Sequence, residues 1–121
     1  MSKRILVVED QEDNRRIVRD LLTSVGYEIV EAVTGEEGVS MAITHAPDLI
    51  LMDIQLPGID GYEATRRIKA QAELRQIPII AVTSYALSGD DVKAFEAGCD
   101  AYVSKPFSPR ALLAKIREFV P

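Results

Sequence analysis

The sequence has one cysteine, one histidine, no tryptophan and no long apolar run. Because Cys99 stands alone, the chain has neither an internal disulfide nor a cysteine-based zinc site. His45 is the only histidine that a Ser-His-Asp cluster could use. No apolar stretch approaches the roughly 18 residues of a membrane span, and the first residues lack the apolar core of a signal peptide. These absences predict a cytoplasmic protein with no membrane role.

Basic residues are also few, since 14 lysines and arginines stand against 19 aspartates and glutamates. The net charge of -5 and the pI near 4.9 argue against direct binding to nucleic acid phosphates. A length of 121 residues fits a single domain, with room for one site.

What the chain does have is apolar runs of strand length. Residues 5–8, 49–52 and 79–82 are continuously apolar, which is typical of strands buried on both faces of a parallel sheet. Two weaker runs, 29–33 and 101–103, carry β-branched or aromatic residues and are also predicted to be strands.

Helical patterns alternate with these strands. The first is expected to end at Gly26, and the other four have N-cap residues at Thr34, Asp60, Ser88 and Ser108. Strict alternation of strand and helix predicts right-handed crossovers and an α/β fold with a doubly wound, five-stranded parallel sheet. A closed eight-fold barrel would need about 250 residues.

Polar side chains follow four of the predicted strands, at the edge where ligands bind in open sheets of this kind. They are Glu9, Asp10, Asp53, Thr83 and Lys105. Taken singly, each is an ordinary solvated loop or cap residue, and only the group is specific. Two carboxylates about 5 Å apart repel by roughly 3 kcal/mol at a dielectric constant near 20, so three together indicate a bound cation. Oxygen ligands with few carboxylates favour Mg²⁺.

An aspartate beside a divalent ion can attack phosphorus and form an aspartyl phosphate. Asp53 is the best candidate, since it ends the central predicted strand, while Lys105 and Thr83 can donate to the phosphoryl oxygens. The added charge of about -1.5 to -2 would suit a local switch.

Four segments together resemble the receiver domain of two-component response regulators. They are residues 5–10, residues 47–61, Thr83 and residues 101–107, and the similarity covers essentially the whole chain. It is closest to the stand-alone, DivK-type members of the CheY-like superfamily. The resemblance implies a flavodoxin-like (βα)5 fold with strand order 2-1-3-4-5.

The resemblance also implies a role for each matching residue. Asp53 would accept the phosphoryl group, and Mg²⁺ would be held by Glu9, Asp10, Asp53 and the backbone carbonyl of Gln55. Thr83 would be the switch hydroxyl, Lys105 its lysine partner and Tyr102 the aromatic switch, and Pro106 would follow a cis peptide bond.

By the same resemblance, residues 1–121 form one receiver domain with no output domain. The phosphoryl donor would be a phosphohistidine on a sensor histidine kinase or histidine phosphotransfer protein. The output would be a contact with a downstream protein through the fourth helix, fifth strand and fifth helix. The chain would not be an enzyme beyond catalysing its own phosphoryl transfer and dephosphorylation.

One departure from the family pattern, two variable positions and three alternatives remain. Ser84 replaces the usual smaller residue, and Gln55 and Tyr85 occupy positions that tune phosphoryl lifetime in this family.

A Mg²⁺-dependent aspartyl-phosphate phosphohydrolase is the main rival, although Gln55 stands where its general acid would be. The chain could also be the receiver fragment of a longer regulator or hybrid kinase. A flavin carrier is disfavoured, because the loop after the first strand is acidic and would repel a phosphate.

Overall fold

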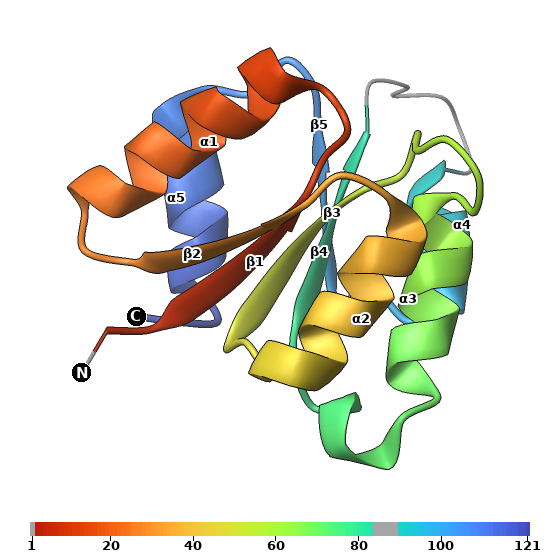
Figure 1. The fold of residues 1–121 in the computed structure, drawn as a ribbon. Coiled ribbons are helices and arrows are strands. Elements are labelled where there is room, and N and C mark those ends of the chain that lie inside the picture. Colours follow the sequence, from red (N-terminus) through yellow and green to blue (C-terminus); the bar gives the residue numbers. More distant parts are fainter. Residues whose placement is uncertain (1, 84–89) are drawn as a thin grey trace.

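The computed structural model describes residues 2–83 and 90–121 (Figure 1). Within these residues one parallel sheet has five strands in the order β2-β1-β3-β4-β5. The strands are β1 (Arg4–Val8), β2 (Glu28–Ala32), β3 (Leu49–Asp53), β4 (Ile79–Thr83) and β5 (Ala101–Ser104). The predicted fold class and strand order are confirmed, and every strand boundary lies within one residue of its prediction.

Helices cover both faces of the sheet. In the described residues they are α1 (Glu12–Ser24), α2 (Gly35–His45), α3 (Gly61–Lys69), α4 (Asp90–Ala97) and α5 (Pro109–Arg117), with a short 3-10 helix at Ala72–Leu74. Figure 1 shows α1 and α5 on one face and α2, α3 and α4 on the other.

Three of the predicted N-caps are confirmed by hydrogen bonds. The side chains of Thr34, Asp60 and Ser108 each accept from the backbone N–H three residues later, at 2.9 to 3.0 Å. Each bond satisfies one of the N–H groups that the first turn of a helix leaves unpaired. The fourth predicted cap, Ser88, lies outside the described residues, and α4 is described from Asp90.

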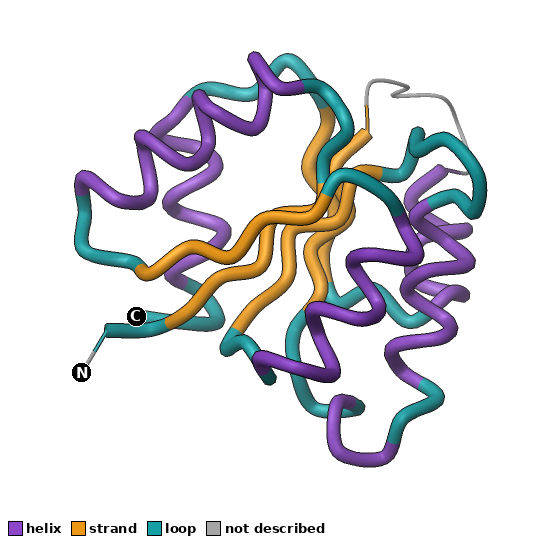
Figure 2. The backbone as a smooth tube through the Cα atoms, viewed as in Figure 1, coloured by secondary structure: helices purple, strands orange, loops and turns teal. Residues whose placement is uncertain are grey.

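Alternate residues of each strand build two apolar layers, one on each side of the sheet. Figure 2 shows the strands side by side, with helices on both sides of them. Ile5 and Val7 pack with α1 and α5, whereas Leu6 and Val8 pack with α2 and α3. Burying a side chain of this size contributes roughly 1.5 to 3 kcal/mol. The strands are therefore fixed from both faces, and their carboxyl ends are held together at one edge.

No helix in the described part of the chain is long and apolar enough to cross a membrane.

Candidate phosphoryl-acceptor site

The first acidic pair stands at the end of β1. The Glu9 N–H donates to the carbonyl of Ala32 at 3.0 Å, which extends the pairing of β1 with β2 by one residue. The Glu9 carboxylate is buried, with 6% of the residue exposed, and Asp10 beside it is partly exposed. The Gln11 N–H donates to Glu9 Oε2 at 3.2 Å. The sheet and the start of α1 thus hold Glu9 from both sides.

Asp53 is the last residue of β3 and is only 4% exposed. Its Oδ1 accepts from the backbone N–H of Gln55 at 3.1 Å. Gly61 lies against the backbone of Asp53 and Ile54, where a Cβ atom would come within 2.7 Å of Ile54 Cα. This close approach of α3 fixes the turn that follows Asp53.

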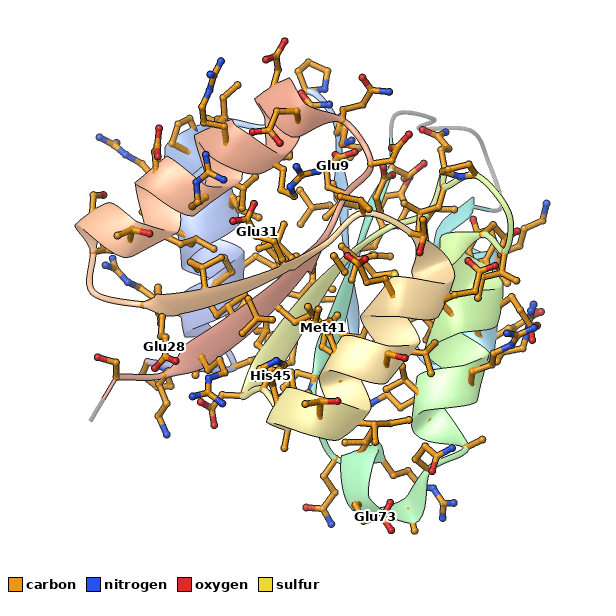
Figure 3. The ribbon with its side chains drawn as sticks, viewed as in Figure 1. Glu9, Glu28, Glu31, Met41, His45 and Glu73 are labelled. Carbon is orange, nitrogen blue, oxygen red and sulfur yellow. The ribbon has the colours of Figure 1, made fainter. Side chains whose placement is uncertain are left out.

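Lys105 reaches the same place from the end of β5. Its backbone N–H donates to the carbonyl of Thr83 at 2.6 Å, and its Nζ lies 2.7 Å from Glu9 Oε1 and 3.7 Å from Asp53 Oδ2. The peptide bond to Pro106 is cis, as predicted. Figure 3 shows Glu9 at the edge where the strands end.

The structure therefore brings together the residues predicted from the strand ends. One carboxylate oxygen from each of Glu9, Asp10 and Asp53 lies within 4.8 Å of the other two. Thr83 is buried at the end of β4, beside the Lys105 backbone, and Tyr102 is half-buried against the α2 and α3 side of the sheet.

The pKa values of the two buried carboxylates are shifted in opposite directions. Burial, a hydrogen bond with Glu9 and the charge of Glu9 raise the pKa of Asp53 to about 7, against the opposing effects of Lys105 and the Gln55 N–H. Burial would also raise the pKa of Glu9, but hydrogen bonds from Lys105, Asp53 and Gln11 together lower it. Of the two acids, Asp53 therefore binds a proton more readily, and Glu9 more readily keeps its negative charge.

This donor set fits a hard divalent cation. It consists of oxygen atoms only, it carries more negative charge than Lys105 can balance, and Asp10 is open to solvent, which leaves room for retained waters. A cation among these oxygens would favour the ionised form of Asp53.

The single histidine and the single cysteine of the chain take no part in this site. His45 is at the end of α2, at the opposite edge of the sheet (Figure 3), and its backbone carbonyl accepts from Arg4 Nη1 at 3.2 Å. Cys99 is buried, and burial raises the pKa of its thiol to about 11. Ser84 and Tyr85 lie outside the described residues.

Two features of the site were not predicted from the sequence. A cavity of about 480 Å³ opens beside the carboxylates and runs beneath α1, where Ile17, Leu51 and Phe107 line it. Arg15 on α1 donates to the backbone carbonyl of Glu9 at 2.9 Å. The sequence pattern shows only that Ile17 has helical spacing and that Arg15 is charged, and both are ordinary features of a surface helix.

Comparison with protein families finds one match over nearly the whole chain. Residues 5–117 match the response regulator receiver domain family. Among individual proteins, the polar-differentiation response regulator DivK of Brucella ovis is 44% identical over 120 residues, which are 99% of this chain and 98% of that protein.

Solved structures show the same likeness. The receiver domain of a sensor histidine kinase from Pseudomonas aeruginosa PAO1 has a TM-score of 0.92 and 38% identity, covering 99% of this chain and 98% of its own. That structure has a magnesium ion coordinated in its active site cleft. A CheY-like receiver domain protein from Methanospirillum hungatei has a TM-score of 0.91 and 36% identity, covering 98% of this chain and 93% of its own.

Proposed function

Since the chain belongs to the response regulator receiver domain family of two-component signalling, we propose that it is switched by phosphorylation of Asp53. The observation that carries this assignment is the position of Asp53: a buried carboxylate with a raised pKa, within 4.8 Å of two further acids and 3.7 Å from Lys105. Buried acids with raised pKa values beside other charged groups are typical of reactive sites, which supports Asp53 as the acceptor.

We assign a magnesium site to the carboxylates of Glu9, Asp10 and Asp53 and to the backbone carbonyl of Gln55. The oxygen-only donor set supports this assignment, and the similar Pseudomonas receiver domain has magnesium in its active site cleft. When bound, the ion supplies positive charge that screens the approach of a phosphoryl group to the acids.

The phosphoryl step would transfer the group from a nitrogen of the donor to an oxygen of the acceptor. A carboxylate oxygen of Asp53 attacks phosphorus, the P–N bond of a phosphohistidine breaks, and its electron pair returns to the imidazole nitrogen. Asp53 attacks in its ionised form, so the raised pKa of its carboxyl group opposes transfer until that group is deprotonated. Lys105 Nζ, already between both acids, can donate to a phosphoryl oxygen.

Thr83 and Tyr102 would convert phosphorylation into a change of surface. Thr83 ends β4 next to Lys105, within the same edge as Asp53, and its hydroxyl is a suitable second donor to the phosphoryl group. Tyr102 lies on β5 and is half-buried, so a turn of its ring as Thr83 moves would change the surface that a partner meets. The register pairs Thr83 with Ser104, two residues after Tyr102.

The partners would be proteins. The donor is a sensor histidine kinase or a histidine phosphotransfer protein, and a downstream protein would recognise the surface around α4, β5 and α5. The exposed Val92 and Phe95 on α4 support a protein contact there, with 53% and 52% of each residue exposed. The net charge of -5 supports neither a nucleic acid nor an anionic membrane as the target. We place this signalling in the cytoplasm.

The rival phosphohydrolase would need a general acid two residues after the nucleophile. That position is Gln55, whose amide does not titrate in the physiological range. We therefore propose that the chain catalyses only the gain and loss of its own phosphoryl group, with no turnover of an external substrate.

The deciding experiment is incubation with acetyl phosphate, with and without Mg²⁺, followed by intact-mass measurement. We expect one phosphate adduct on the wild type with Mg²⁺, and none on Asp53→Asn or in excess chelator. The same adduct on both proteins, or its formation without metal, would rule out the proposed site. Turnover of many equivalents of an unrelated phosphate ester would favour the hydrolase.

A further inference from the structure

We propose that Arg15 is a positioning residue of the magnesium site. Its guanidinium holds the peptide group that joins Glu9 to Asp10, and so sets the direction in which two of the carboxylate ligands project. This inference rests on the proposed function, because it presupposes that these acids bind the ion.

Arg15 is buried far more than its position on a surface helix requires. Its side chain is 12% exposed, compared with 57% for its neighbour Arg16. A guanidinium has five N–H donors in a rigid planar fork, which suits simultaneous contact with several acceptors. The side chain turns toward the end of β1 and uses these donors there.

The guanidinium joins three segments of the chain. Nη1 donates to the backbone carbonyl of Glu9 at 2.9 Å, Nε donates to Glu31 Oε1 on β2 at 2.9 Å, and Nη2 pairs with the carboxylate of Glu12 in the first turn of α1. Each bond involves a charged group, so each is stronger than a neutral hydrogen bond. The orientation of the guanidinium is therefore fixed.

The Glu9 carbonyl lies just past the last backbone hydrogen bond between β1 and the end of β2. The Glu9 N–H is still paired with Ala32 of β2, but the next peptide group lies past the last paired residues of β1 and β2. That peptide group carries Glu9 on one side and Asp10 on the other. Without Arg15, rotation of this peptide group would swing Asp10 relative to Glu9.

A second arginine, one turn further along α1, binds the same Glu31 but makes no hydrogen bond to Glu9 or Asp10 within the described residues. Arg19 Nη1 donates to both carboxylate oxygens of Glu31, at 3.0 and 3.1 Å. Figure 3 shows Glu31 in the region between α1 and the sheet, below Glu9. Arg19 has the same charge as Arg15 and shares its Glu31 partner, and it also pairs with Asp20 on its own helix. It is therefore a matched control.

The electrostatic and the positioning effects of Arg15 have opposite signs. A positive charge near the acids repels a cation, so removing the charge should by itself tighten metal binding. Loss of positioning should weaken it, since substitution of a residue that orients metal ligands typically costs 10- to 100-fold in metal affinity. Weaker binding by a neutral variant can therefore not be an effect of charge.

The choice of ion separates positioning from a general loss of structure. Mg²⁺ requires near-ideal octahedral geometry, whereas Ca²⁺ tolerates irregular coordination. Misplaced carboxylates should weaken the binding of Mg²⁺ more than the binding of Ca²⁺. Partial unfolding would weaken the binding of both ions equally.

The test is a titration of wild type, Arg15→Gln, Arg15→Lys and Arg19→Gln with Mg²⁺ and with Ca²⁺, followed by backbone amide NMR, which also reports whether each variant is folded. We expect Arg15→Gln to bind Mg²⁺ about tenfold more weakly, with a smaller loss for Ca²⁺. Arg15→Lys keeps the charge but loses the planar guanidinium with its several donors, so it should also bind Mg²⁺ more weakly. Arg19→Gln should bind as the wild type or slightly tighter.

The outcomes separate this inference from the proposed function. A wild type that binds no Mg²⁺ would overturn the proposed metal site itself. A wild type that binds, with Arg15→Gln binding equally or more tightly, would overturn the role of Arg15 alone. If a folded Arg15→Gln bound Mg²⁺ and Ca²⁺ more weakly by the same factor, the positioning role of Arg15 would also be overturned.

Discussion

Among single residues, Asp53 is the one whose presence destabilises the metal-free fold. Folding buries its carboxylate beside the charged Glu9, which raises its pKa to about 7 from an ordinary value of 3.8. Between these pH values the folded protein binds a proton that the unfolded chain does not. The contribution of Asp53 to the free energy of unfolding therefore decreases as pH rises from about 4 to about 7, and stays low above that.

Replacing Asp53 with asparagine should consequently stabilise the protein in chelator. Asparagine keeps the shape and removes the titration, while Lys105 keeps its 2.7 Å contact with Glu9. At pH 8 we expect Asp53→Asn to gain on the order of 2 kcal/mol in the free energy of unfolding, and the gain should vanish near pH 4. Urea unfolding at both pH values measures the difference.

Asp20→Asn is the control for this measurement. The Asp20 side chain is 74% exposed on α1, so its replacement should change stability by less than about 0.5 kcal/mol at either pH. If Asp53→Asn were less stable than the wild type at pH 8, the buried carboxylate could not be a destabilising group.

The closeness of the strand-end residues was predictable, because they lie at the ends of strands whose carboxyl ends must meet. Glu9, Asp53 and Lys105 needed only the strand pattern to be placed together. The contact of Arg15 was not predictable, since a long side chain on a helix can point to solvent or inward, and only the packed neighbours decide. The raised pKa of Asp53 likewise depends on burial and distances that appear only in the fold.

Among the elements, α3 approaches β3 most closely at Gly61. A Cβ on Gly61 would collide with the backbone oxygen of Asp53 and come within 2.7 Å of Ile54 Cα. Both neighbours are backbone atoms, so the strand end or the helix must move. The residue displaced is the proposed phosphoryl acceptor.

Gly61→Ala should therefore both destabilise the fold and impair the site. We expect a loss of about 1 to 3 kcal/mol, as for other overpacked substitutions, together with weaker Mg²⁺ binding. Urea unfolding and metal titration measure the two effects separately.

Gly26→Ala is the matched control for Gly61→Ala. Gly26 has a φ of +95°, and beyond its chain neighbours no atom lies within 4 Å of the place that a Cβ would take, so alanine there is strained without crowding any other residue. It should lose stability but keep the Mg²⁺ affinity of the wild type. Equal metal affinity in Gly61→Ala and Gly26→Ala would show that α3 does not set the position of Asp53.

The strands followed from the sequence to within one residue. Three of them are runs of four consecutive apolar residues, which fit a strand covered on both faces, and the other two were marked by β-branched or aromatic residues. The N-cap residues Thr34, Asp60 and Ser108 predicted helix starts correctly, because an N-cap depends only on a backbone N–H three residues later. The 3-10 helix Ala72–Leu74 was missed, since three residues are too few to show a period.

In the whole molecule, the acidic cluster lies at the edge where the central strands end and both apolar layers meet. Ile5, Val7 and Leu51 belong to the layer under α1 and α5, and Val8 and Met52 belong to the opposite layer. Repulsion among the acids thus acts on strands that hold the two layers together. Relieving it should stabilise the entire fold rather than one loop.

Magnesium should therefore raise the melting temperature of the whole domain. At a concentration one hundred times its dissociation constant, a ligand that binds only the folded state adds about 2.7 kcal/mol to the free energy of unfolding. For a chain of 121 residues this corresponds to a rise of roughly 10 °C. The rise should be larger at pH 8 than at pH 6, because at the lower pH the ion competes with the proton on Asp53.

Thermal melts with MgCl₂, and with NaCl at equal ionic strength, test this directly. Salt alone screens surface charges but cannot bridge the buried carboxylates, so NaCl should give a much smaller rise. Asp53→Asn starts from a higher melting temperature and has lost one ligand, so its rise with Mg²⁺ should be small at both pH values. An equal rise in the variant and the wild type would mean that the ion stabilises the protein elsewhere, and Asp53 would have no part in holding it.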